Sequence, residues 1–327
     1  MNTHAHKTAY VFSGIDGLDK MSDRALMLSL PAVKARIAQA QKVLDKCAPG
    51  FDLTEYISSS DEDFKRVFTL QAIAVTVVHI ALFDMFTASG EKPDYLMGCS
   101  LGDVARSYCA GALEFDVIIA ASWNYHLKAS KIEGCSAYYI RVIDGTISKE
   151  RIQEITDAGI YFAVHQTPRH FLVTGTIEKL EQWRLNEAPK ARYKISPIYD
   201  KPLHSPLMTF ITDETYKLYA HTVRPMEELK YKMVSSTFIG LIETREQLLK
   251  DMVDNFNSTV RWMEALQYAV NELGVTRLVN IGPVPTLLLF AERTPLNYPV
   301  EMVNYLAVTP KPAFEERAPT FIPAPAV

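Results

Sequence analysis

The sequence has few cysteines, no large excess of charge and no apolar leader. Its cysteines are widely spaced and form no C-x-x-C pair, which argues against a zinc site or a disulfide framework; they are Cys47, Cys99, Cys109 and Cys135. A net charge of -4 at pH 7 leaves no broad cationic surface for nucleic acid. Residues 1–7 carry no apolar h-region, and no run reaches the roughly 18 apolar residues of a membrane span. We therefore expect a cytoplasmic protein that binds no metal, membrane or nucleic acid.

What the chain has is a large apolar content. Its 327 residues are 48% hydrophobic, enough for a large core in one domain or in a domain that carries an insertion. The first half predicts a strand at 9–12, helices at 26–44 and 61–88, and a strand at 95–97. The residues after 308 are rich in proline, so 309–327 are expected to form a tail that adds nothing to the core.

Shorter elements follow between about residues 131 and 200. They alternate as strand, helix, strand, strand, helix and strand, at 137–142, 148–158, 160–165, 171–174, 177–185 and 192–198. This order is that of the ferredoxin-like split unit. The pattern predicts an α/β protein in which a ferredoxin-like α+β subdomain, 131–200, is inserted into a core formed by 1–130 and 201–308.

The most informative motif is the pentapeptide Gly98-Cys99-Ser100-Leu101-Gly102, a G-x-S-x-G pattern between an apolar strand and a helix. A serine hydroxyl can attack an acyl carbon when a tight strand-to-helix turn lifts it out of the sheet, and glycines let the backbones pack closely there. The turn also directs the Leu101 amide at a developing oxyanion. Ser100 is therefore the candidate nucleophile.

A second motif supplies the base that a serine requires. His204 lies in Leu203-His204-Ser205-Pro206-Leu207-Met208, far downstream of the elbow. A hydroxyl is almost entirely protonated at neutral pH, so a nearby imidazole must accept its proton. Of the eight histidines in the chain, His204 is the candidate general base.

With both motifs in place, the chain resembles the malonyl-CoA:acyl carrier protein transacylase family, which includes polyketide synthase acyltransferase domains. The resemblance runs from Tyr10 to about Ala291. The matching segments are GCSLGD at 98–103, AGAL at 110–113, HSPLM at 204–208, VRW at 260–262, IGP at 281–283, and the stretch from QTP at 166–168 to VTG at 173–175. Ordered motifs at compatible spacing are far more specific than one pentapeptide.

The resemblance implies a Ser-His dyad in an α/β-hydrolase-like core. Ser100 would take an acyl group from a thioester and give it to the phosphopantetheine thiol of an acyl carrier protein. The main-chain carbonyl of Asn255 would hold the His204 ring, and the amides of Leu101 and Ile15 would form the oxyanion hole. No bound metal or redox cofactor is implied.

Several positions depart from the family pattern. Ile15 replaces a glutamine, which leaves the amide available. The arginine that clamps the malonyl carboxylate falls on Tyr125, and a neutral phenol cannot cancel that charge. Cys99 replaces the histidine before the serine, and Leu203 lies in a segment, 201–204, that matches neither common specificity motif.

These departures predict the acyl group and the pocket. We expect Tyr125 and Trp123 to form an apolar wall that suits a non-malonyl, apolar or longer acyl group, with Cys99 and Leu203 nearby. Gln166 either lines the pocket from the small subdomain or ends a strand. Three functions are compatible with the sequence: transfer of a non-malonyl acyl group between CoA or acyl carrier protein thioesters, hydrolysis of such thioesters by the same dyad, and non-catalytic binding of a carrier protein.

Overall fold

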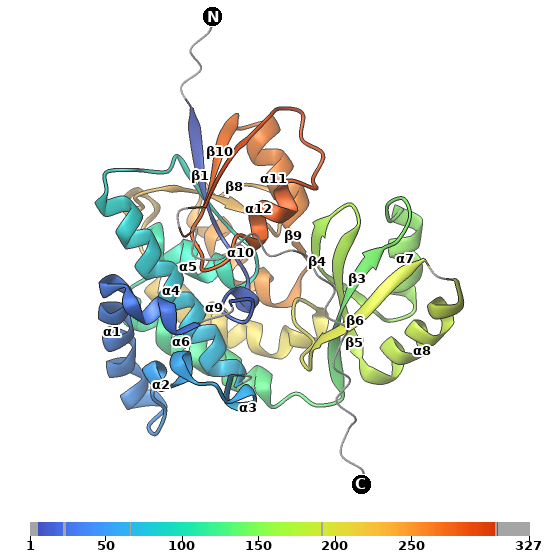
Figure 1. Cartoon of the computed structure of the whole chain (residues 1–327), viewed down its shortest axis with the longest axis horizontal. Helices are drawn as coiled ribbons and strands as arrows, with labels where there is room; N and C mark the ends of the chain where they lie inside the picture. Colours follow the sequence, from blue (N-terminus) through green and yellow to red (C-terminus); the bar gives the residue numbers. More distant parts are fainter. Residues whose placement is uncertain (1–5, 22–23, 66, 191, 305, 307–327) are drawn as a thin grey trace, which may run out of the picture.

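The computed structural model describes residues 6–21, 24–65, 67–190, 192–304 and 306. Figure 1 shows two units side by side, the larger built around a six-stranded sheet and the smaller around a five-stranded one. The strands of the larger sheet are β1 (Lys7–Phe12), β2 (Tyr95–Gly98), β7 (Lys232–Ser235), β8 (Gly240–Leu241), β10 (Val275–Asn280) and β11 (Glu301–Asn304). They lie in the order β11-β10-β1-β2-β7-β8, all parallel except β8.

Helices cover both faces of the larger sheet, and β1 shows why. Its side chains alternate, so Tyr10 and Phe12 enter one apolar cluster while Ala9 and Val11 enter another. Helices α1 (Pro31–Cys47), α4 (Phe68–Ala88), α5 (Leu101–Cys109) and α6 (Phe115–Ser130) pack into the first cluster. Helices α11 (Trp262–Asn271) and α12 (Thr286–Ala291) pack into the second. This layered arrangement explains the nearly continuous apolar character of the central strands.

Helix α4 corrects one expectation from the sequence. Its 21 residues are long and apolar enough, by length and composition, to cross a membrane, although we had expected no such run. In the structure 89% of its most apolar window is buried inside the protein. A helix that is apolar on all sides is what the centre of a large core requires, because every face meets other protein atoms.

The predicted helices at 26–44 and 61–88 are each interrupted. The first is a 3-10 turn, Arg24–Ser29, followed by α1, which begins at Pro31 because proline fits the first helical position. The second is the short α3 (Glu62–Lys65) followed by α4. The remaining helices of the larger unit are α2 (Leu53–Ser58), α9 (Thr212–Thr222) and α10 (Arg245–Asn257).

The smaller unit has the element order that the sequence predicts. Its elements are β3 (Cys135–Val142), α7 (Lys149–Asp157), β4 (Tyr161–Thr167), β5 (His170–Thr176), α8 (Ile177–Glu187) and β6 (Tyr193–Tyr199). The strands lie in the order β6-β3-β5-β4 with antiparallel neighbours, and they enclose their own apolar cluster. Strand β9 (Val260–Arg261), from the larger unit, extends this sheet beside β4.

The two units are therefore joined by the pairing of β9 with β4 as well as by the two places where the chain passes from one unit to the other. The predicted boundaries at 130 and 200 fall between elements, before β3 and after β6, and as domain boundaries they stay a prediction. The predicted tail, 309–327, lies outside the described residues.

Candidate active site

Ser100 lies on a tight turn between β2 and α5. Its φ of 60° and ψ of -120° are strained for a residue with a side chain. Both flanking glycines are required by close backbone approach: a Cβ on Gly98 would lie 2.4 Å from the Asp103 nitrogen, and one on Gly102 would lie 2.0 Å from the Phe12 oxygen. The G-x-S-x-G sequence therefore forms the predicted elbow for a steric reason.

His204 is placed by the segment between β6 and a 3-10 turn at Pro206–Ile211, and it too has a positive φ, of 55°. The segment is fixed on both sides. Lys201 Nζ donates to the Ile132 carbonyl at 2.9 Å, and Ser205 Oγ donates to the Pro202 carbonyl at 2.7 Å. The imidazole is thus held on a short constrained loop rather than on a helix.

The two predicted reactive groups meet. Ser100 Oγ lies 2.6 Å from His204 Nε2, and His204 Nδ1 lies 2.5 Å from the Asn255 carbonyl oxygen. A carbonyl can only accept, so Nδ1 carries the proton and Nε2 is left to accept from the serine hydroxyl. Burial lowers the pKa of His204 to about 4. At neutral pH the ring is neutral and able to take a proton.

Leu101 and Ile15 occupy equivalent positions beside Ser100. Leu101 is the first residue of α5 and Ile15 the first residue of the 3-10 turn Ile15–Gly17. The amides of first helical residues have no partner within their own helix. A Cβ built on Gly14 would lie 3.9 Å from the Ser100 Cβ, so the loop that carries Ile15 runs against the elbow. Ile15 also lines both cavities with Ser100, and the role of the two amides as an oxyanion hole stays a prediction.

Two cavities of very different size meet at the Ser100–His204 pair. The larger, about 530 Å³, lies between the two units and is mostly apolar. It is lined by Ala137, Tyr139, Ala163, Val164, Leu172, Ile198, Tyr199, Leu287 and Phe290, among others. The smaller, about 30 Å³, lies on the α6 side of the pair. Ile15, Ser100, Leu203 and His204 border both.

The structure brings four of the five predicted pocket residues to these cavities. Cys99, Gln166 and Leu203 line the larger one, so Gln166 faces the pocket from the small unit. Burial raises the pKa of the Cys99 thiol, which keeps it protonated and unreactive. Tyr125 and Leu203 line the smaller cavity.

Trp123 was wrongly predicted to line the pocket. It borders neither cavity and packs instead on Phe51, with ring centroids 5.5 Å apart. Two residues apart on α6, Trp123 and Tyr125 project in different directions. The sequence signal that could have separated them was this helical spacing, which places only one of the two side chains toward the serine.

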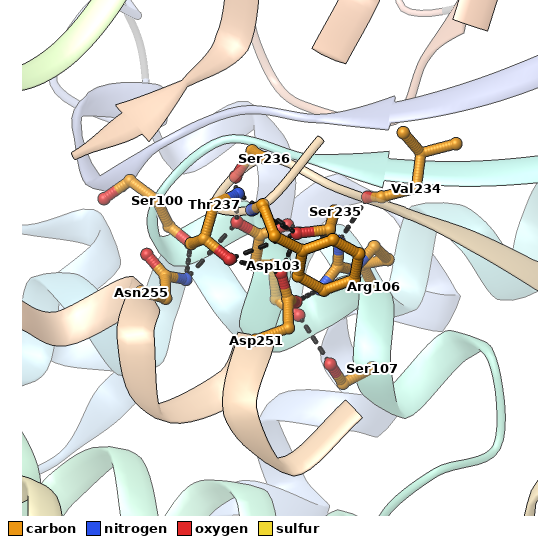
Figure 2. A network of polar contacts seen from close by, with 11 residues as sticks. Ser100, Asp103, Arg106, Ser107, Val234, Ser235, Ser236, Thr237, Asp251 and Asn255 are labelled. Carbon is orange, nitrogen blue, oxygen red and sulfur yellow. Dashed lines mark hydrogen bonds and ion pairs between the residues drawn. The ribbon is translucent and has the colours of Figure 1, made fainter. Parts of the chain in front are cut away.

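A buried polar network below the elbow was not predicted. Asp103 and Asp251 both pair with Arg106, whose side chain is fully buried, and Arg106 Nη1 also donates to the Val234 carbonyl (Figure 2). Ser236 and Thr237 donate to the two carboxylates, each at 2.9 Å. Burial and the nearby Asp251 raise the pKa of Asp103 to about 7, although Arg106 opposes the shift.

This network reaches the nucleophile through Asn255. Figure 2 shows the contacts of the Asn255 side-chain amide with Ser100 and with Asp103. Its Nδ2 donates to the Ser100 carbonyl at 2.9 Å and lies 3.3 Å from Asp103 Oδ2. We had expected Asn255 to act only through its main chain, and its side chain contacts the elbow as well. A signal was present in the spacing of Asp251 and Asn255, four residues apart on one face of α10.

Three charged residues at the larger cavity were also missed. Asp16 and Lys20 form an ion pair one helical turn apart, and Asp19 lies beside them. Burial raises the pKa of Asp19 to about 6, and Gln71 donates a hydrogen bond to it. These residues follow the Ile15 loop directly, so the charges at this cavity come from the same segment as the predicted oxyanion donor.

The comparisons with known proteins agree with this arrangement. The family described as the acyl transferase domain matches residues 9–312. The chain belongs to this family. A malonyl CoA-acyl carrier protein transacylase from Synechocystis sp. is 23% identical over 291 residues, covering 88% of this chain and 94% of the relative.

Solved structures show the same fold. The malonyl CoA-acyl carrier protein transacylase of Coxiella burnetii aligns with a TM-score of 0.78 at 20% identity, over 91% of this chain and 93% of that chain. A malonyl transacylase solved with its type II polyketide synthase acyl carrier protein aligns with a TM-score of 0.80 at 20% identity, over 91% of this chain and 95% of that chain. The mixed α/β fold is therefore that of these transacylases.

No metal centre accompanies the site within the part of the chain that the structure describes: there, no group of three or more His, Cys, Asp or Glu side chains could hold an ion.

Proposed function

We propose that this acyl transferase domain protein transfers a non-malonyl acyl group between thioesters, of CoA or of an acyl carrier protein, through an acyl-serine intermediate on Ser100. The observation that carries the proposal is the 2.6 Å contact between Ser100 Oγ and His204 Nε2, with Nδ1 held by the Asn255 carbonyl. Such an arrangement makes a hydroxyl nucleophilic without a catalytic carboxylate. The names of the relatives, which are transacylases of acyl carrier proteins, support the same reaction type.

The reaction takes place in two half-reactions. Ser100 Oγ attacks the thioester carbonyl carbon while His204 Nε2 takes the hydroxyl proton, and the amides of Leu101 and Ile15 stabilise the oxyanion. The carbon–sulfur bond then breaks, and the departing thiolate receives the proton from His204. In the second half-reaction the acceptor thiol gives its proton to His204 and attacks the acyl-serine. The bond between the acyl carbon and Ser100 Oγ then breaks, and His204 returns the proton to Oγ. Because acyl and proton are the only groups moved, we propose that no metal or redox cofactor takes part.

The choice of a non-malonyl group rests on the charges around the dyad. The described residues that line the smaller cavity include no lysine or arginine, and burial lowers the pKa of both of its histidines, His126 and His204, to about 4. In the larger cavity Lys20 is already paired with Asp16, and Asp19 adds a second carboxyl. A malonyl carboxylate would therefore be buried without a cationic partner, at a cost of several kcal/mol.

The remaining contacts suit a thioester arm in the larger cavity. Gln166 Oε1 is buried and accepts no hydrogen bond from the described part of the chain, so it can accept one from an amide of the arm. Cys99 and Leu203 supply apolar wall. In this proposal the α/β-hydrolase-like core carries the dyad, and the ferredoxin-like subdomain, 131–200, contributes the wall opposite it.

Intact-mass spectrometry tests the proposal. The protein is incubated with acetyl and malonyl thioesters, and the mass added by each acyl group is followed with time. We expect an acetyl adduct that Ser100→Ala abolishes and that persists until an acceptor carrier protein is added. Release of free acid without acceptor would identify a hydrolase. If no thioester gives an adduct, the remaining function is non-catalytic binding of a carrier protein. Malonyl labelling as fast as acetyl labelling would contradict the argument from charge.

A further inference from the structure

The dyad separates two spaces that must hold the two substituents of a thioester. The carbonyl carbon carries an acyl chain on one side and a sulfur with its long arm on the other. The cavities that meet at Ser100 and His204 measure about 530 Å³ and about 30 Å³. Each substituent must therefore occupy one of two spaces that differ greatly in volume.

The arm belongs in the larger space. A phosphopantetheine arm is long and remains joined to CoA or to a carrier protein, so it must run from bulk solvent to the serine. A cavity of about 530 Å³ is in the range that holds drug-sized ligands, about 300–1,000 Å³. The acyl chain is then left with the smaller cavity, which Leu101, at the start of α5, also borders.

Tyr125 closes this smaller cavity. Its ring stacks on Phe256 at a centroid distance of 3.9 Å and an interplanar angle of 28°, and it meets the edge of His126 at 4.8 Å. Phe256 directly follows Asn255, whose carbonyl holds His204. The wall is therefore fixed by the same helix end that positions the base.

Tyr125 also borders a third space. A cavity of about 380 Å³ lies between α6 and α9 and is lined by Tyr125 together with residues such as Asn124, Ile211, Leu218 and Tyr219. Of the described lining residues, Tyr125 alone borders both this space and the smaller cavity, so it is the side chain whose truncation would join them.

We propose that Tyr125, supported by Phe256, sets the acyl chain length and restricts the enzyme to a two-carbon, uncharged acyl unit such as acetyl. This inference rests on the proposed acyl-serine function. A volume of about 30 Å³ holds one or two non-hydrogen atoms, whereas a cavity that binds benzene measures about 150 Å³. A chain of six carbons would have to displace the Tyr125–Phe256 stack.

The test measures the rate of acyl-serine formation by intact mass with acetyl, butyryl, hexanoyl and octanoyl pantetheine thioesters. For the unmodified protein we expect the rate to fall at least about tenfold between acetyl and hexanoyl, as misfit methylenes generally cause. In Tyr125→Ala the small cavity joins the one between α6 and α9, so we expect hexanoyl labelling to rise at least about tenfold relative to acetyl. Tyr125→Phe keeps the ring and should keep the acetyl preference.

Trp123→Ala is the matched control. It removes a large aromatic side chain from the same helix, but that side chain packs on Phe51 and borders neither cavity of the dyad. We expect it to lower stability and leave the ratio of hexanoyl to acetyl labelling unchanged. Tyr125→Val, a smaller truncation, replaces Tyr125→Ala if the alanine variant does not fold.

Two results would overturn the inference. One is equal labelling of the unmodified protein by acetyl and hexanoyl, which would place the acyl chain in the larger cavity. The other is a folded Tyr125→Ala or Tyr125→Val protein with an unchanged chain-length profile. Absence of adduct with every thioester is a different result, because it rejects the proposed acyl-serine chemistry itself.

Discussion

The side-chain amide of Asn255 donates a hydrogen bond of 2.9 Å to the main-chain carbonyl of Ser100. The same residue accepts from His204 through its own carbonyl. Asn255 therefore links the strained serine turn to the imidazole, and both reactive groups depend on the end of one helix, α10. The proposed dyad has no third side chain to orient the base, and in this proposal the main-chain carbonyl and the side-chain amide of Asn255 position the two groups.

Asn255→Ala tests this link. The main-chain carbonyl remains, while the Ser100 carbonyl loses one of its two donors and keeps the Asp103 amide at 2.9 Å, and the loss of one such hydrogen bond costs about 0.5–1.5 kcal/mol. We expect kcat for acyl transfer to fall about 3- to 10-fold with a smaller change in KM, measured by steady-state kinetics with an acetyl thioester. Asn257→Ala, at the last residue of α10, is the control and should leave kcat within about twofold.

Arg106→Met tests the network below the elbow. Arg106 is fully buried between Asp103 and Asp251, so its loss leaves two buried carboxyls without their cation, and breaking such a pair costs about 3–5 kcal/mol. We expect that loss in the free energy of urea unfolding. Arg224→Met removes an arginine from an exposed pair with Glu114 and should cost less than about 1 kcal/mol. Equal losses in the two variants would show that burial of the network is not what stabilises the elbow.

Much of this site could be predicted because its parts carry local sequence signals. The elbow follows from glycines whose Cβ atoms would collide with the backbone, and the element order of the small unit follows from alternating short apolar runs. Ser100 and His204 lie in motifs that are typical of a serine nucleophile and of its general base. The order of the motifs suggests that the two side chains meet, but their contact at 2.6 Å depends on the tertiary structure.

The parts that were missed depend on long-range contacts or on side-chain direction. In the sequence Arg106 looks like an ordinary helical arginine. Its partners Val234, on β7, and Asp251, on α10, lie more than a hundred residues away and contact it only in the folded protein. Trp123 was misplaced because its proximity to Tyr125 in sequence was taken for proximity in space. The Tyr125–Phe256 stack that borders the smaller cavity joins two helices far apart in the sequence and has no local signature.

Gly102→Ala tests the steric reading of the elbow. The new methyl group would lie 2.0 Å from the Phe12 oxygen, so β1 or the first turn of α5 must move. We expect a loss of about 3 kcal/mol in unfolding free energy, the upper end of the usual cost of overpacking, and no detectable acyl-serine. In Gly240→Ala the nearest atom, in the Phe238 ring, is 3.5 Å away, and this control should fold and label normally. A stable, active Gly102→Ala protein would contradict the close approach of β1 to the elbow.

The pH dependence of kcat/KM tests the state of His204. Burial lowers the pKa of this histidine from 6.5 to about 4, and the ring must be neutral to accept the serine proton. Activity should therefore be full above pH 6.5 and be lost only as the pH falls through about 4. We expect an acid limb with a midpoint near 4 for an acetyl thioester; a midpoint near 6.5 would show that the ring is solvated in the free enzyme.

Folding must be followed by circular dichroism at each pH, because the buried histidines act on stability in the same range. Burial lowers the pKa of His79 to about 3 and that of His126 to about 4, so the unfolded chain binds protons at these groups that the folded chain does not. Their contribution to stability is complete above pH 6.5 and declines as the pH falls. A loss of activity that coincides with loss of helical signal reports unfolding, whereas one that precedes it reports protonation of His204.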